Sequence, residues 1–116
     1  MPYVRICTSA KVNEEKVAAI RKIVGEKICL IPGKSFEVTI IHIEPEAIIS
    51  RGDPSDPMLF MEVRLFGPTS TGSKKDFARE ICAALEAELG IPQKFMSLNI
   101  MEMDGWGGNG DYNNFR

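Results

Sequence analysis

The feature that most constrains this chain is a strand–helix–strand pattern that occurs twice in succession. The first copy predicts a strand, a helix and a strand over residues 3–7, 13–30 and 35–44. The second copy predicts the same order over residues 58–66, 73–89 and 95–102. Because such crossovers are right-handed, both helices are expected on the same side of a shared sheet. The pattern therefore predicts an α+β fold with tandem β-α-β repeats, in which a four-stranded mixed sheet carries two helices on one face.

The two helices are predicted by apolar residues that recur at helical spacing. In the first helix these residues are Val17, Ile20, Val24 and Ile28, and in the second they are Phe77, Ile81, Leu85 and Leu89. Pro32 and Gly33 cannot continue the first helix, and Gly90 stands where a helix commonly ends. Ser73 is predicted to cap the start of the second helix.

The strands of the second repeat predict a sheet with two different faces. The alternating row assigned to the helices is Leu59, Met61, Val63 and Leu65. The opposite row, continued on the last strand, includes Phe60, Glu62, Arg64, Phe66, Asn99 and Met101. That mixture is too apolar for open solvent and too polar for a dry core, so it predicts burial against other subunits around a wet centre. The alternative is a monomer whose open face is covered by residues 45–57 and the tail.

Length and charge limit the classes of function. A chain of 116 residues fits one domain, expected to span residues 1–116. Its 14 basic and 16 acidic residues give a net charge of −2 and form no long block, so nucleic acid is not expected as a partner. No apolar run approaches the roughly 20 residues that span a bilayer, and the start lacks a signal-peptide pattern. We therefore expect no membrane association and a cytoplasmic location.

Cysteine and histidine usage argues against a metal site. Cys7, Cys29 and Cys82 are odd in number and lack metal-type spacing, which predicts buried free thiols in a reducing compartment. The single histidine, His42, lies in a strongly apolar strand, where a hydrogen-bonded structural role is expected. A zinc or other metal centre is therefore not predicted.

The tail from Asp104 to Arg116 combines glycine and asparagine with three aromatic residues, Trp106, Tyr112 and Phe115. Disordered tails seldom contain so many aromatic side chains. We therefore expect the tail to pack against a folded surface, namely that of a neighbouring subunit.

Pro2 follows the initiator methionine and precedes the first strand. If Met1 is removed, the ring nitrogen of Pro2 becomes a free secondary amine, and terminal amines titrate at about 8 in water. Apolar surroundings penalise the charged form and lower that pKa, which would suit a general base near neutral pH. The alternative is a proline that simply begins an edge strand, where its missing N–H does no harm.

Several short motifs follow one another along this chain. Their order and spacing together resemble those of the tautomerase superfamily and, within it, of the macrophage migration inhibitory factor family. The motifs cover nearly the whole chain and are Met1-Pro2, Pro32-Gly33-Lys34, Ile41-His42-Ile43-Glu44-Pro45, Ser55-Asp56-Pro57, Gly90-Ile91-Pro92, Asn99 and a Trp/Gly/Asn tail.

The resemblance implies a homotrimer of β-α-β repeats with one pocket at each subunit boundary. It implies a keto-enol tautomerase that acts on small, phenylpyruvate-like 2-oxo acids without a metal or organic cofactor. By that resemblance Pro2 is the catalytic base and Lys34 binds the substrate carboxylate. Phe66 is an apolar pocket residue whose backbone helps to hold the substrate, and Asn99 reaches the pocket from the adjacent subunit.

Departures from the family pattern keep alternatives open. Ser97 replaces a tyrosine that stacks on aromatic substrates in well-known members, and methionines replace a Cys-x-x-Cys pair. A second hypothesis, suggested by the cytokine members of the family that the chain resembles, is a signalling protein that keeps the trimer, has a protein receptor and leaves the cell without a signal peptide. Lys34 could also be a solvated lysine at a helix end, and Asn99 a residue that bonds sheet-edge backbone.

Overall fold

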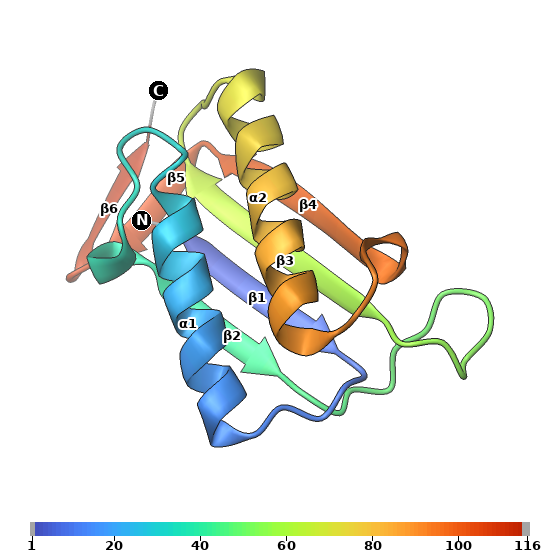
Figure 1. Ribbon diagram of the computed structural model, residues 1–116. Coiled ribbons are helices and arrows are strands. Elements are labelled where there is room, and N and C mark those ends of the chain that lie inside the picture. The colour runs from blue at the N-terminus through green and yellow to red at the C-terminus, as the bar shows by residue number, and fades with distance from the viewer. Residues whose placement is uncertain (1, 115–116) are drawn as a thin grey trace.

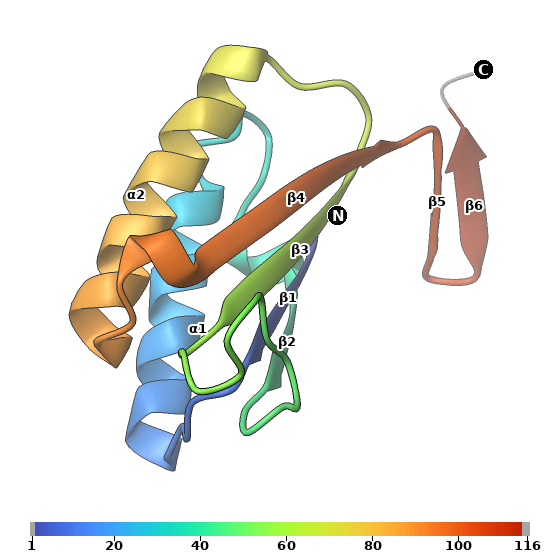
Figure 2. The ribbon, with the colours of Figure 1, turned by 90° about the vertical axis from the view of Figure 1, so that its right-hand side faces the viewer.

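The computed structural model describes residues 2–114 of the chain. The strands and helices of the two repeats are β1 (Tyr3–Thr8), α1 (Glu14–Ile28), β2 (Ile40–Glu44), β3 (Leu59–Phe66), α2 (Thr71–Leu89) and β4 (Met96–Met103). Two short 3₁₀ helices, η1 (Phe36–Val38) and η2 (Gln93–Phe95), precede β2 and β4. Both long helices cover the same face of the sheet (Figures 1 and 2). Neither is long and apolar enough to cross a membrane.

The four strands are arranged in the order β2-β1-β3-β4. β1 is parallel to β2 and β3 is parallel to β4, as two strand–helix–strand repeats require. The repeats are joined by antiparallel pairing of β1 with β3, so the sheet is mixed. The predicted sheet with two helices on one face is confirmed.

The hydrophobic core lies between the helices and one face of the sheet. Its sheet side is made of alternate residues of β1 and β3, namely Val4, Ile6, Leu59, Met61, Val63 and Leu65. Its helix side is made of the predicted stripes, whose fully buried members are Ile20, Val24, Ile28, Phe77, Ile81 and Leu85. The assignment of the two faces of β3 is therefore confirmed. The expected burial of all three thiols is wrong for Cys29, which is exposed, while Cys7 and Cys82 are partly buried.

The helix termini follow local side-chain hydrogen bonding. Asn13 caps α1 by accepting a hydrogen bond from the Lys16 N–H at 2.9 Å. The predicted cap of α2 was wrong by three residues, because Ser70 takes that role and accepts from the Ser73 N–H at 3.1 Å. Gly90 ends α2 at φ 71°, a left-handed conformation that glycine adopts without strain.

The segment before β2 differs from the prediction. Residues 36–38 form η1 instead of the first part of a strand. The Thr39 hydroxyl donates a hydrogen bond of 2.5 Å to the backbone carbonyl of Ser35, which closes the turn. Phe36 packs against α1 at Gly25, where an added Cβ would lie only 2.5 Å from the ring. Local hydrogen bonding and this contact outweigh the β-branched composition of the segment.

The tail forms a β-hairpin that was not predicted, with β5 (Gly105–Gly108) antiparallel to β6 (Asp111–Asn114). Asn109 and Gly110 connect the strands with φ 52° and 74°, as a two-residue type I′ turn requires. The Asn-Gly pair was the signal in the sequence that identifies this turn. The hairpin projects away from the helices, beyond the end of β4 (Figure 2).

Replacing Phe77 by alanine is expected to lower the free energy of unfolding by about 3–5 kcal/mol, because the ring is fully buried between α2 and the sheet. The measurement is urea unfolding followed by circular dichroism. Phe36→Ala is the matched control, because its ring is 49% exposed and its loss should be clearly smaller. Equal losses for the two variants would contradict this description of the core.

Candidate active site

Pro2 lies directly before β1 and is buried. Its carbonyl accepts a hydrogen bond from the Ile40 N–H at 2.9 Å, which joins it to the first residue of β2. Because β1 runs antiparallel to β3 and Tyr3 pairs with Arg64, Pro2 lies beside the last residues of β3. The fold therefore brings Pro2, the start of β2 and the end of β3 to one end of the sheet.

Lys34 reaches this end of the sheet from the connection between α1 and β2. Its Nζ donates a hydrogen bond to the carbonyl oxygen of Phe66 at 3.0 Å. The lysine follows Gly33, which has φ 81°, and its own N–H bonds the Ile31 carbonyl at 3.2 Å. Two of the residues named from the sequence, Lys34 and Phe66, are therefore in direct contact, and both are partly buried.

Asn99 lies elsewhere on the same chain. It pairs with Glu62 in the middle of β4 and is exposed on the open face. The β1–β3 register places Pro2 opposite Leu65, three residues from Glu62, or roughly 10 Å along the strands. β1 and β4 are also separated by β3, which adds roughly 10 Å across the sheet. One chain therefore brings three of the four predicted site residues together and leaves Asn99 apart.

A groove of about 350 Å³ lies between the open face of the sheet and the hairpin. The side chains that line it are Tyr3, Ile40, Arg64, Met103, Trp106 and Tyr112. It adjoins Pro2, because Tyr3 follows that residue and Ile40 bonds its carbonyl. The Arg64 guanidinium lies 5.6 Å from the centre of the Tyr3 ring, so the groove combines aromatic surface with a cation.

The groove includes residues that the sequence did not identify as part of the site. Tyr3 and Ile40 were assigned only to strands, and sequence spacing alone does not show that these two strands are neighbours. Trp106 and Tyr112, two aromatic residues of the tail, line this groove, and Tyr112 is 62% exposed within the single chain. Phe115, the third aromatic residue of the tail, lies outside the described residues.

Charged side chains on the open face neutralise one another. Arg5 donates to both carboxylate oxygens of Glu44, at 3.0 and 2.9 Å, and lies 3.5 Å from Glu62. Glu62 also pairs with Arg64 at 3.2 Å. Hydrogen bonding from Arg5, and its positive charge, hold the pKa of Glu44 below its ordinary value. The same contact raises the pKa of Arg5, so the pair stays ionised at neutral pH.

His42 belongs to this polar network. Its Nδ1 lies 2.8 Å from the Tyr3 hydroxyl, and its Nε2 lies 3.0 Å from a carboxylate oxygen of Glu44. Both ring nitrogens are thus engaged, as expected for a hydrogen-bonded structural histidine. Among residues 2–114, no group of three or more His, Cys, Asp or Glu side chains is arranged to hold a metal ion.

The arrangement around Pro2 contains the groups that a proton-transfer site for an anionic substrate requires. Pro2 is buried, the Lys34 ammonium lies at the same end of the sheet, and the groove lined by Tyr3 and Ile40 adjoins Pro2. Burial lowers the pKa of an amine, and a lysine binds a carboxylate as a compact charge.

Comparison with known proteins gives consistent matches. The sequence model of the family described as macrophage migration inhibitory factor (MIF) matches residues 1–110. Macrophage migration inhibitory factor of Xenopus laevis is 30% identical over 80 residues, which are 66% of this chain and 70% of the relative. That of Xenopus tropicalis is 24% identical over 115 residues, which are 93% of this chain and 96% of the relative. The crystal structure of Leishmania major MIF2 has the same fold, with a TM-score of 0.82 at 21% identity and 97% of each chain covered.

Glu44→Gln is expected to destabilise the protein at neutral pH, because it removes the ionised partner of Arg5. Since the pKa of Glu44 is lowered by folding, its contribution is present above the unfolded pKa and is lost as pH falls through the folded pKa. The difference in urea midpoint between wild type and variant should therefore shrink as pH is lowered from 7 to 3. Glu37→Gln, at an exposed position, is the control. A difference that grows toward acid pH would refute this account of the pair.

Proposed function

Because the chain belongs to the macrophage migration inhibitory factor family, we propose that it is a keto-enol tautomerase for small 2-oxo acids of the phenylpyruvate type. The observation that carries the proposal is the meeting of Pro2, Lys34 and Phe66 at one end of the sheet. The reaction is an isomerisation that needs no metal or organic cofactor, since one group can both remove and return the proton.

Pro2 is the proposed base. After removal of Met1 its ring nitrogen is a secondary amine. Its burial and the nearby Lys34 ammonium both disfavour the protonated form, so the amine is neutral near pH 7. The neutral nitrogen takes a proton from the carbon beside the substrate carbonyl. The protonated amine then gives a proton to the enolate oxygen, which completes the conversion of keto form to enol form, and the reverse reaction uses the same two steps in the opposite order.

Lys34 is the proposed anchor for the substrate carboxylate. An ammonium group carries three N–H donors, so the bond to the Phe66 carbonyl leaves two for a substrate. The same bond fixes the direction of a long, flexible side chain before substrate arrives, which reduces the entropy lost on binding. The groove beside Tyr3 offers apolar surface for the organic group of the substrate.

Assembly of three chains would complete the site. Asn99 is too far from Pro2 within one chain to contact a shared substrate, so we propose that it serves the pocket of an adjacent subunit. Two features support assembly. The open face mixes apolar and charged side chains, and β5 and β6 form an isolated two-stranded hairpin, which is marginally stable in water unless it packs against something.

The second candidate function is signalling through a protein receptor. It is favoured by the two Xenopus relatives, whose name refers to inhibition of macrophage migration. Catalysis and signalling would use the same fold, so measurement of enol-keto conversion tests the first candidate directly.

Pro2→Gly is expected to lower kcat/KM for phenylpyruvate tautomerisation by about 10²-fold or more, because it replaces the constrained secondary amine of the base. The rate of enol-keto conversion is followed by absorbance for both proteins. Mass spectrometry must first establish that Met1 is absent from each. Equal rates for wild type and variant would eliminate Pro2 as the base.

Lys34→Gln is expected to raise KM for 2-oxo acids about tenfold with a smaller effect on kcat, because the substrate carboxylate loses a charged hydrogen bond. Lys75→Gln, at an exposed position on α2, is the matched control and should leave both constants unchanged. If both variants bind substrate as wild type does, the carboxylate is held by another group.

A further inference from the structure

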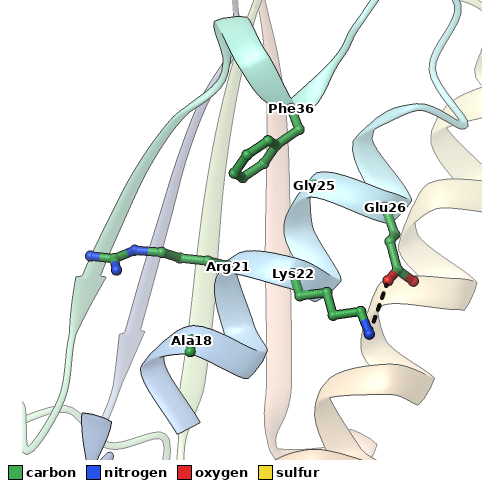
Figure 3. Close-up of a pocket in the computed structure, with 6 residues that line it drawn as sticks. All are labelled: Ala18, Arg21, Lys22, Gly25, Glu26 and Phe36. Carbon is green, nitrogen blue, oxygen red and sulfur yellow. Dashed lines mark ion pairs between the residues drawn. The ribbon is translucent and has the colours of Figure 1, made fainter. Parts of the chain in front are cut away.

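A second groove, lined by none of the residues that line the groove beside Pro2, lies on the outer surface of α1. It has a volume of about 470 Å³, within the range of small-molecule sites, and its walls are almost entirely apolar. The lining residues are Ala18, Arg21, Lys22, Gly25, Glu26 and Phe36 (Figure 3). All except Phe36 come from α1, and Phe36 comes from η1.

Phe36 forms one wall of this groove because Gly25 has no side chain. A Cβ at position 25 would lie 2.5 Å from Cδ1 of the ring, so any other residue would force the ring outward. The ring is nevertheless 49% exposed, and its free face borders the groove. A large aromatic surface is thus held against the helix and left open on one side.

The charges around the groove favour an anion. Within residues 2–114, the Arg21 side chain takes part in no ion pair or hydrogen bond. Lys22 lies 4.0 Å from Glu26, a distance that leaves only a weak exposed pair. Figure 3 shows Arg21 leaving the helix on the side away from Lys22 and Glu26. The groove therefore has an available guanidinium beside an apolar floor.

We propose that this groove binds small amphipathic carboxylates, meaning an alkyl or aryl chain that ends in a carboxylate group. The alkyl or aryl part of the ligand lies on Phe36 and on the helix surface at Gly25 and Ala18, where its removal from water favours binding. The carboxylate accepts two hydrogen bonds from Arg21, whose planar guanidinium matches its geometry. The proposal does not depend on tautomerase activity, because the groove shares no lining residue with the groove beside Pro2.

The test uses decanoate as the probe, with decanol and decylamine as matched neutral and cationic compounds. Each is titrated into the ¹⁵N-labelled protein and followed by amide chemical shifts. Decanoate should saturate shifts of residues 18–26 and 36–38 and bind more tightly than either control compound. Arg21→Gln should weaken it by about tenfold, as expected for loss of a hydrogen bond to a charged group. Lys75→Gln, the control for an exposed cation, should have no effect.

Phe36→Ala should also weaken binding, since it removes the apolar wall. Should that variant fail to fold, Gly25→Ala displaces the ring by contact and tests the same wall. Equal affinity for the three compounds, or an Arg21→Gln affinity equal to that of wild type, would overturn the proposal.

Binding of decanoate at the candidate active site, instead of the groove on α1, would also overturn the proposal. In that case the shifts would centre on residues near Pro2 and Phe66, and Lys34→Gln would abolish them. If instead Lys34→Gln binds decanoate normally while Arg21→Gln does not, the groove on α1 is the site, whatever the outcome of the tautomerase assay.

Discussion

Burial of one face of the sheet beneath two helices is the interaction on which the rest of this structure depends. Alternate residues of β1 and β3, such as Val4 and Val63, are removed from water on that face. A shift of pairing by one residue would turn every one of them toward solvent, so the register is strongly fixed. The residues between them are thereby directed to the open face, where Arg5 and Glu44 neutralise each other. One apolar face thus determines the position of both the core and the polar network.

The candidate active site follows from the same register. Since β1 lies between a parallel and an antiparallel neighbour, its first residue meets the start of β2 and the end of β3. Lys34 precedes β2 by a short connection and can therefore contact Phe66, 32 positions later in sequence. Backbone topology brings the proposed base and the proposed anchor for the carboxylate together. Asn99, on the outer strand β4, lies apart from them within the same chain.

Much of this architecture could be predicted from the sequence, because periodicity reports burial directly. The stripe containing Phe77 and the alternating row containing Met61 were both read correctly. The start of β2 was predicted too early, at residue 35 instead of Ile40. The reason is that the packing of Phe36 on Gly25 is a contact between segments that composition does not reveal. The contact between Lys34 and Phe66 likewise could not be predicted from residue types and spacing. Only the family resemblance assigned these two residues to the same pocket. The hairpin was missed although its Asn-Gly turn gave a local signal.

The central position of β1 has a consequence for synthesis of the chain. β1 is made first, yet one of its two neighbours, β3, ends only at Phe66. After β2 is complete at Glu44, a ribosome adding roughly 5–20 residues per second needs about one to four seconds to finish β3. During that interval the edge of β1 that later pairs with β3 is unpaired and open to association with another nascent chain. The strand that directly follows the proposed catalytic residue therefore keeps one edge open until the second repeat begins to form.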